Sequence, residues 1–399
     1  METTSAFRGL TCTDCEASFD AAEATHRCPD CGGILDPAYD YDAVDLSRAD
    51  LRERRFDGMC RYDDLLPFPR AATVTMDEGT TPLVECPDLA DELGVGRLLI
   101  KDEGRNPTGS FKDRGQALAV TAASQHGATD VALPTAGNAG QAAAAYAARA
   151  GLDSHVFVPT RANFVNKAMI NVHGGDMHVV EGRLDDAAAE FADWMDRDDK
   201  DWYSVATFET PYRHEGKKTM YYEIAEQLDF ETPDAVVYPT GGGVGLVGMY
   251  KGAREFRDLG LTDDVPGFYA AQASGCAPIV SAIEDGDDEA SAWEQPDTIC
   301  GGIEVADPGA GSKLVLEAIR ESDGGAVATD DDDILESGVA VAQHAGIEMG
   351  ATCAAAASGA WDLSQQGTFG EDDTVVLVNT AAGNKEDDIL RSHLMGQGI

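Results

Sequence analysis

A single lysine stands in a stretch of the chain with an unusual set of neighbours. Lys112 belongs to residues 106–115, which read NPTGSFKDRG. The turn-forming pair Asn106 and Pro107 and the flexible Gly109 lead into a predicted helix start. Lysine forms Schiff bases with carbonyl compounds where burial or neighbouring charge keeps some of its amine unprotonated. We interpret Lys112 as a candidate Schiff-base lysine; the alternative is an ordinary solvated helix N-terminus.

A glycine-rich loop follows a predicted strand and opens a predicted helix. Its residues are Thr240, Gly241, Gly242, Gly243, Val244 and Gly245. Glycines let backbone N–H groups converge on an anion, and a helix N-terminus adds partial positive charge. The direct interpretation is a phosphate site, although the loop is neither a Walker loop nor a Rossmann fingerprint. A tight turn that serves close packing is the alternative.

Three polar segments could complete a binding site. Residues 134–140, PTAGNAG, offer the Thr135 hydroxyl and the Asn138 carboxamide to a carboxylate or a ring substituent, or else form a helix N-cap. Thr380 ends a late predicted strand and could meet a ring nitrogen, unless it only begins a turn. Residues 211–219, PYRHEGKKT, are the one concentrated basic patch and could attract an anionic substrate, or form a solvated helix start.

Four of the nine cysteines form two closely spaced pairs. They are Cys12, Cys15, Cys28 and Cys31. Two CxxC pairs in turn-rich settings can place four thiolates around Zn²⁺ tetrahedrally, which predicts a structural zinc ribbon. The alternative is four thiols without metal, and His26 is a spare candidate ligand. The other five cysteines are scattered, which fits reduced thiols in a cytosol.

The charge balance is extreme, with 72 acidic and 29 basic residues and a net charge of −43. Such a chain repels nucleic acid and anionic membranes. We interpret the scattered aspartates as a halophile-type surface that needs screening by salt. No apolar run is long enough for a membrane helix, and the first residues do not resemble a signal peptide. The composition therefore predicts a cytoplasmic protein.

Strand and helix patterns must position these groups. Short apolar strands alternate with helices from Leu98 onward, which predicts parallel sheets covered on both faces. The strands are expected at Leu98–Ile100, Val131–Leu133, His155–Val158, Met177–Val180, Ala235–Tyr238, Phe268–Ala271 and Val375–Val378, and helices include Ala139–Arg149, Lys217–Leu228 and Leu246–Asp258. In such α/β folds ligands bind beyond the carboxyl ends of the strands, where the candidate loops fall.

The motifs NPTGSFKDRG, TAGN, GGGVG and NTAAGNK, in this order, resemble those of fold type II pyridoxal-phosphate enzymes. Within that class the chain is most similar to the threonine synthase family. The similarity includes the cysteine ribbon, the stretch EGTTPL at residues 78–83 and the segment RHEGKKT at residues 213–219. It extends over nearly the whole chain.

The resemblance implies a fold and a set of domains. It implies two doubly wound open-sheet α/β domains and the N-terminal zinc-ribbon-like segment. Residues 1–40 are expected to form the ribbon, residues 41–110 and 205–399 the larger cofactor-binding domain, and residues 111–204 a smaller domain that closes over the active site. It also implies a homodimer that acts on a small amino-acid substrate.

The resemblance also implies the roles of the site residues. Lys112 would hold pyridoxal phosphate as an internal aldimine and then move protons. The further cofactor-binding residues would be Phe111, Asn138, Gly241, Gly242, Gly243, Val244, Gly245 and Thr380, and the substrate-binding residues Thr135, Ala136, Gly137, Arg213 and Lys217, with Lys218 in support.

The implied reaction converts O-phosphohomoserine and water to threonine and phosphate. Some positions depart from the family pattern: Ala139 stands where a hydroxyl is usual, and Thr207 and Thr210 replace asparagines. The end motif is TAAGNK where TGHGLK is usual. Because each change alters a polar group near the expected substrate phosphate, a dehydratase or β-replacement enzyme acting on a non-phosphorylated amino acid is the alternative. A non-catalytic binding protein would not need Lys112.

Overall fold

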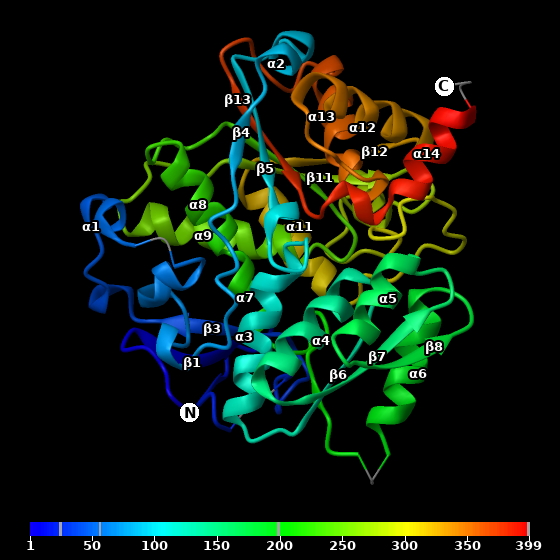
Figure 1. The fold of residues 1–399 in the computed structure, drawn as a ribbon. Helices are drawn as coiled ribbons and strands as arrows, with labels where there is room; N and C mark the ends of the chain where they lie inside the picture. Colours follow the sequence, from blue (N-terminus) through cyan, green and yellow to red (C-terminus); the bar gives the residue numbers. More distant parts are fainter. Residues whose placement is uncertain (24–25, 56, 198–199, 397–399) are drawn as a thin grey trace. The chain divides into compact units, whose positions relative to one another are not determined.

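The computed structural model describes residues 1–23, 26–55, 57–197 and 200–396 (Figure 1). The chain divides into two compact units, each made of several segments. Unit 1 comprises residues 1–80, 112–222 and 258–261, and unit 2 comprises residues 81–111, 223–257 and 262–399. Among the described residues, no helix is both long and apolar enough to span a membrane.

Unit 1 contains a small antiparallel sheet and a parallel four-stranded sheet. The first has the order β2-β1-β3, with β1 Phe7–Cys12, β2 Ser18–Phe19 and β3 Leu35–Tyr39, and the second has the order β8-β7-β6-β9, with β6 Asp130–Pro134, β7 Asp153–Pro159, β8 Asp176–Val180 and β9 Tyr203–Ser204. The helices are α1 Arg48–Glu53, α3 Lys112–Gln125, α4 Asn138–Ala150, α5 Phe164–Val172, α6 Leu184–Met195 and α7 Tyr212–Lys217, with 3-10 turns η1 Tyr41–Ala43, η2 Cys60–Leu65 and η3 Arg70–Ala72.

Helices cover both faces of the parallel sheet of unit 1. A Cβ on Gly140 of α4 would lie 2.5 Å from Val156, so α4 packs directly on that side chain of β7. The next residue, Phe157, instead packs its ring against Phe191 and Trp194 of α6. Successive side chains of a strand point to opposite faces, so α4 and α6 lie on opposite sides of β7.

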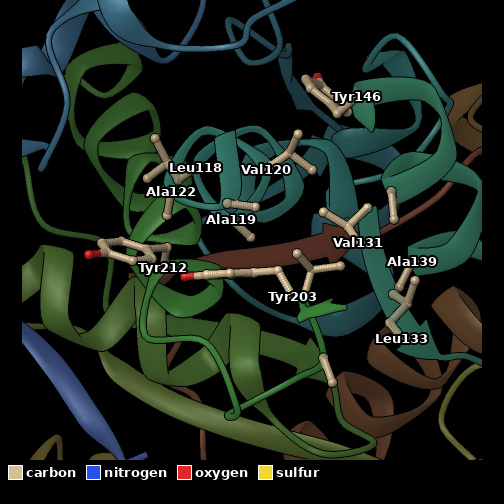
Figure 2. Close-up of a cluster of buried hydrophobic side chains, with 14 of the residues drawn as sticks. Leu118, Ala119, Val120, Ala122, Val131, Leu133, Ala139, Tyr146, Tyr203 and Tyr212 are labelled. Atoms are coloured by element: carbon tan, nitrogen blue, oxygen red, sulfur yellow. The ribbon is translucent and has the colours of Figure 1, made fainter. Parts of the chain in front are cut away.

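The core of unit 1 joins this sheet to α3 and α7. Figure 2 shows Leu118 and Ala122 of α3 near Tyr212 of α7, while Val131 of β6 lies near Tyr203 of β9. Small alanines on α3 and α4 let these helices approach closely, and alanine also has the highest helix propensity. This packing fixes the start of α3, where Lys112 stands.

Unit 2 is built on a six-stranded sheet of order β12-β11-β10-β13-β5-β4, parallel except for β4. Its strands are β4 Leu83–Glu85, β5 Arg97–Asp102, β10 Ala235–Pro239, β11 Gly267–Ala273, β12 Gly325–Thr329 and β13 Thr374–Asn379. Its helices are α2 Pro87–Leu93, α9 Val244–Asp258, α10 Pro278–Asp285, α11 Gly311–Glu321, α12 Asp331–Ala345, α13 Ala351–Gln365 and α14 Asp387–Gly396, with 3-10 turns η4 Glu103–Arg105 and η5 Gly383–Lys385, whereas α8 Thr219–Gln227 begins in unit 1 and ends in unit 2.

This second sheet is also covered on both faces. A Cβ on Gly359 of α13 would lie 2.9 Å from the side chain of Ala271, whereas Tyr250 of α9 makes an edge contact with Phe268. Residues 268 and 271 of β11 have side chains on opposite faces, so α9 and α13 cover different sides. The prediction of two doubly wound α/β sheets is confirmed.

The expected strands and helices are present, within a few residues at their ends. The helix expected at Lys217–Leu228 corresponds to α8, which begins two residues later at Thr219, while Lys217 is the last residue of α7. Residues 41–80 and 205–222 are grouped with unit 1, and the expected division into domains stays a prediction. The reason for this grouping is packing: Met59, Leu66 and Phe68 lie in the same buried cluster as Tyr212. Closure of a smaller domain over the active site stays a prediction.

Candidate active site

Lys112 is the first residue of α3 and combines partial burial with a neighbouring positive charge. Burial lowers the pKa of its amine from 10.5 to about 7, and the charge of Arg213 lowers it in the same direction. The charged form of an amine is disfavoured both by removal from water and by a nearby cation. Near neutral pH a large fraction of the amine is therefore unprotonated and nucleophilic.

Arg213 is placed by a close crossing of α3 and α7. A Cβ on Gly115 of α3 would lie only 2.7 Å from the backbone carbonyl oxygen of Arg213. Gly216 of α7 lies still more tightly against the backbone of Arg114, whose carbonyl oxygen would be closer than this to a Cβ there. Because each helix presents a glycine to the other at the crossing, the buried Arg213 is held within electrostatic reach of Lys112.

The basic residues at the end of α7 have different partners. The Lys217 amine donates a hydrogen bond to the carbonyl oxygen of Arg213 at 3.0 Å. Lys218 instead forms a fully buried ion pair with Glu215 and lies 4.2 Å from the centre of the Tyr39 ring. The hydroxyl of Tyr39 also donates to Glu215. Lys218 is thus held by structural partners, and Arg213 and Lys217 remain the candidates for an anionic substrate.

The loop before α4 is shaped by Thr135. Its hydroxyl oxygen accepts hydrogen bonds from the N–H groups of Gly137 at 2.9 Å and Gly140 at 3.2 Å. Gly137 is the N-cap residue of α4 and has no side-chain cap, but the Thr135 hydroxyl satisfies one N–H group of the first helical turn, that of Gly140. Its own O–H proton can still be donated to a carboxylate. Asn138 begins α4 and is half-buried.

Asn166 was not expected from the sequence. It lies on α5, where a Cβ on Gly137 would lie 3.0 Å from the Asn166 Cβ atom. The side chain is buried, and its Oδ1 atom has no hydrogen-bond partner among the described residues. Buried carboxamide oxygens are normally paired, so Asn166 joins the candidate substrate residues of this loop. A lone asparagine outside any motif gives no sequence signal of this kind.

The glycine-rich loop of unit 2 joins β10 to α9, and the helix begins at Val244. Gly243 has a φ of +71°, which requires glycine, and any side chain there would meet Val315. A Cβ on Gly242, in contrast, would meet no atom within 4 Å. The backbone at Gly242 therefore borders open space at the N-terminus of a long helix, which fits an anion such as a phosphate.

Two aromatic rings support this loop. A Cβ on Gly245 would lie 2.7 Å from the Tyr238 ring and 2.9 Å from the Phe111 ring. Phe111 and Tyr238 make an edge contact with ring centres 6.0 Å apart. The Phe111 N–H donates to the carbonyl oxygen of Thr380 at 2.9 Å. The structure thus brings Phe111, Gly245 and the end of β13 together in unit 2, and Lys112 follows Phe111 directly.

Thr380 is buried at the carboxyl end of β13, where its hydroxyl lies 3.3 Å from the Cys353 sulfur atom of α13. Burial raises the pKa of the Cys353 thiol to about 12, so this neighbour is neutral. A neutral hydroxyl beside a neutral thiol can share a hydrogen bond with a ring nitrogen but cannot keep it protonated as a carboxylate would. Cys353 stands far from Thr380 in sequence and was not predicted.

The four paired cysteines form one cluster in the N-terminal sheet of unit 1. The sulfur atoms of Cys12 and Cys31 lie 3.5 Å apart, and those of Cys15 and Cys28 lie 3.7 Å apart. Sulfur ligands of a tetrahedral zinc ion, at about 2.3 Å from the metal, lie about 3.8 Å from one another. The cluster therefore has the dimensions of a zinc site. The His26 ring nitrogen lies 3.0 Å from the Ser204 carbonyl oxygen.

Comparison with known proteins gives a consistent result. The pattern described as "Pyridoxal-phosphate dependent enzyme" matches residues 74–381. A threonine synthase of Methanosarcina acetivorans is 38% identical, over 93% of this chain and 90% of that protein. A threonine synthase of Methanocaldococcus jannaschii is 34% identical, over 94% of this chain and 93% of that protein. The chain therefore belongs to the pyridoxal-phosphate dependent enzymes and, within them, groups with the threonine synthases.

Solved structures agree on the fold. The processed form of threonine deaminase isoform 2 from Solanum lycopersicum matches with a TM-score of 0.65 and 22% identity, and covers 78% of this chain and 87% of that chain. At this identity the match concerns the fold alone. It agrees with the expected fold type II architecture.

Proposed function

We propose that this protein is a threonine synthase that converts O-phosphohomoserine and water to threonine and phosphate. The observation that carries the proposal is the Lys112 amine, whose pKa is lowered to about 7 by burial and by the neighbouring Arg213. A lysine of this kind can act both as nucleophile and as acid or base near neutral pH. The similarity to threonine synthases over most of the chain supports the choice of reaction.

Pyridoxal phosphate, when bound, supplies an electron sink that stabilises negative charge next to the substrate amino group. In unit 2 we assign its phosphate to the N–H groups of residues 241–245 and its pyridine nitrogen to the Thr380 hydroxyl. Phe111 and Tyr238 brace this loop. In unit 1 we assign its covalent attachment to Lys112 and its phenolic oxygen to Asn138.

Lys112 also has the acidity needed to move protons. With a pKa of about 7 its amine can accept a proton from the substrate Cα and return it later in the reaction. A general base is most effective when its pKa lies near the working pH. Burial is the larger cause of this lowered pKa, and the positive charge of Arg213 lowers it further.

Substrate recognition is assigned to unit 1. Thr135, Ala136 and Gly137 would receive the α-carboxylate, because the Thr135 hydroxyl and the backbone N–H groups of this turn are donors. Arg213 and Lys217 would hold the phosphate and stabilise the charge that develops as it leaves. Ala139 is buried and has no polar side-chain atom, so it adds nothing to this phosphate site.

The test compares two substrates. The purified holoenzyme in concentrated salt is given O-phosphohomoserine, with phosphate and threonine measured, and separately threonine, with 2-oxobutyrate measured. We expect phosphate and threonine in equal amounts. Formation of 2-oxobutyrate with no phosphate release would instead assign the protein to the dehydratases. Lys112→Ala should lose turnover by at least about a thousandfold, and Lys167→Ala, on the surface of α5, should retain it.

We further infer that the four-cysteine cluster holds a structural zinc ion. The sulfur spacing supports this assignment. Metal analysis of protein purified without chelators should give one zinc per chain, and Cys28→Ser should lower both the zinc content and the melting temperature. Protein that is stable and zinc-free would contradict the assignment.

We also propose a cytoplasmic homodimer. None of the nine cysteines is paired in a disulfide, which supports a reducing compartment. Exposed Phe164, Val165 and Val172 on α5 and Val179 on β8 offer apolar surface for a second copy. Light scattering in concentrated salt should give twice the chain mass, and a monomer would contradict the proposal.

A further inference from the structure

The parallel sheet of unit 1 brings two histidines and two aspartates onto one face. In the register of β7 and β8, His155 is opposite Asp176, and Phe157 is opposite His178. The three side chains of His155, Asp176 and His178 therefore point to the same face. Phe157 packs on α6, so this is the α6 side of the sheet. Asp130 of β6 reaches the same cluster.

Asp176 lies between the two imidazole rings. Its Oδ2 atom is 3.4 Å from His155 Nδ1 and 3.4 Å from His178 Nε2. Both of these ring nitrogens are buried and have no hydrogen-bond partner among the described residues. Two buried imidazole nitrogens and one carboxylate oxygen thus converge, all within 4.8 Å of one another.

The other nitrogen of His155 is held by a carboxylate. His155 Nε2 lies 2.8 Å from Asp130 Oδ1, which fixes the proton on Nε2 and directs the lone pair of Nδ1 toward Asp176 and His178. A carboxylate that orients a histidine in this way is the usual support of a metal ligand.

The rings are also held by aromatic stacking. The His155 ring stacks on Trp202 with centres 3.9 Å apart, and the His178 ring stacks on Phe157 at 4.4 Å. Trp194 lies against both His178 and Trp202. Neither ring can rotate freely, so the two nitrogens are preorganised.

We propose that His155, Asp176 and His178 bind a first-row divalent cation of the zinc type, at a site separate from the cysteine cluster. Two imidazoles and one carboxylate favour zinc, nickel, cobalt or copper over magnesium or calcium. Ligand atoms about 2.05 Å from a tetrahedral ion lie about 3.3 Å apart, close to the spacing of Asp176 from each ring nitrogen. The exposed side of Asp176 leaves the fourth position to water.

The ion would connect an edge strand to its neighbour. β8 lies at the edge of its sheet and contributes Asp176 and His178, whereas the adjacent β7 contributes His155. Binding would therefore add a link across this pair of strands and raise the melting temperature. A second cluster, Asp36, His214 and Glu215, is a weaker candidate because Glu215 already pairs with Lys218 and Tyr39.

Trp202 and Trp194 supply a direct optical signal for the test. An open-shell ion such as Ni²⁺ quenches an indole that lies a few ångströms away. Full-length protein is first given one equivalent of Zn²⁺ per chain, which the four thiolates of the cysteine cluster bind in preference, and is then titrated with Ni²⁺ in concentrated KCl. We expect saturable loss of tryptophan fluorescence at one Ni²⁺ per chain, reversed by added Zn²⁺.

Variants separate metal binding from folding. Asp176→Asn and His178→Gln should weaken Ni²⁺ binding more than tenfold, and Asp130→Asn should weaken it by about 10- to 100-fold. Lys200 lies 5.0 Å from the Trp202 ring centre and places positive charge nearby, so Lys200→Gln should tighten binding. His344→Gln, on the exposed face of α12, is the matched control and should bind as the wild type does.

Two results would overturn the proposal. One is wild-type protein whose fluorescence shows no saturable response to Ni²⁺, which would leave the cluster as a hydrogen-bonded surface network. The other is unchanged affinity in Asp176→Asn protein that melts at the wild-type temperature. Because threonine synthesis is measured separately, neither result bears on the proposed reaction.

Discussion

At the scale of single residues, two effects lower the pKa of the Lys112 amine to about 7. Burial disfavours its charged form, and the guanidinium of Arg213 repels the same charge. Both are properties of the folded protein, since Arg213 reaches Lys112 only through the crossing of α3 and α7. The motif around Lys112 predicted the lysine, but its acidity depends on a residue far away in sequence.

This dependence predicts a change in a pH profile. In wild-type protein freed of its cofactor, the rate of pyridoxal phosphate uptake should rise with pH and level off above about 7, where the Lys112 amine is mostly neutral. Arg213→Met removes the repelling charge, so the pKa of Lys112 should rise and the midpoint should move to higher pH. Uptake is followed by the absorbance of the bound cofactor.

The matched control is Arg149→Met, at the end of α4, which should keep the wild-type midpoint. An unchanged midpoint in Arg213→Met would show that burial alone sets the pKa of Lys112.

At the scale of elements, the glycine-rich loop offers neighbouring positions with opposite constraints. Gly242→Ala should leave stability within about 0.5 kcal/mol of the wild type, because its Cβ meets no neighbouring atom. If the loop holds the cofactor phosphate, the same change should weaken pyridoxal phosphate binding about tenfold or more. Equilibrium titration and thermal melting measure the two effects separately.

Two further variants, Gly243→Ala and Gly301→Ala, serve as comparisons for Gly242→Ala. Gly243→Ala should lower stability by about 1–3 kcal/mol, because φ is positive and Val315 fills the space. Gly301 has open space and lies outside the loop, so its alanine variant should change neither quantity. Normal cofactor affinity in Gly242→Ala would argue against a phosphate at this position.

A buried ion pair anchors β5 in unit 2. The Lys101 amine donates to Glu223 Oε2 at 2.8 Å, and the Thr81 N–H donates to the same oxygen at 3.1 Å. Glu223→Ala would leave the buried amine of Lys101 without its charge partner, so we expect a loss of about 3–5 kcal/mol. The matched control is Glu85→Ala in the exposed pair with Arg97, which should cost at most about 1 kcal/mol. Urea unfolding in concentrated salt measures both, and equal losses would contradict the argument.

The elements themselves were largely predictable because their patterns are local. Strands such as β7 and β10 are short apolar runs followed by polar loops, and α4 is rich in alanine. The prediction omitted β12, whose sequence GAVAT has no strong strand former apart from its valine and threonine, and the short strands β4 and β9. It also gave no strand bounds for β1, β2 and β3 of the N-terminal sheet. The site was predictable where a motif carries it, as at Lys112, and not where tertiary packing does, as at Asn166 and Cys353.

At the scale of the whole molecule, the net charge of −43 should make stability depend on salt. Exposed like charges repel over a distance of about 10 Å at 0.1 M salt and about 3 Å at 1 M. The melting temperature should therefore fall continuously as KCl is lowered from molar to about 0.1 M. Calorimetry at several KCl concentrations checks this, with a matching series in sucrose to separate screening from solute exclusion. A melting temperature indifferent to salt would contradict the halophile interpretation.

The grouping of segments into two units depends on contacts that local sequence patterns do not describe. A unit depends on which distant segments pack together, and the residues around η2 join α7 in unit 1 through buried side chains such as Leu66 and Tyr212. The similarity to threonine synthases shows the family of the chain, but it does not show which residues form each unit.

The position of β13 has a consequence for synthesis on the ribosome. In the sheet of unit 2, β13 lies between β10 and β5, yet it is the last strand to be translated. Until it emerges, β5 with β4 and β10 with β11 and β12 are separate fragments with open edges. All four strands of the parallel sheet of unit 1 precede residue 205. We expect nascent chains that stop before Thr374 to protect β6 and β7 from proteolysis while β10 stays sensitive, so that the final residues complete the fold.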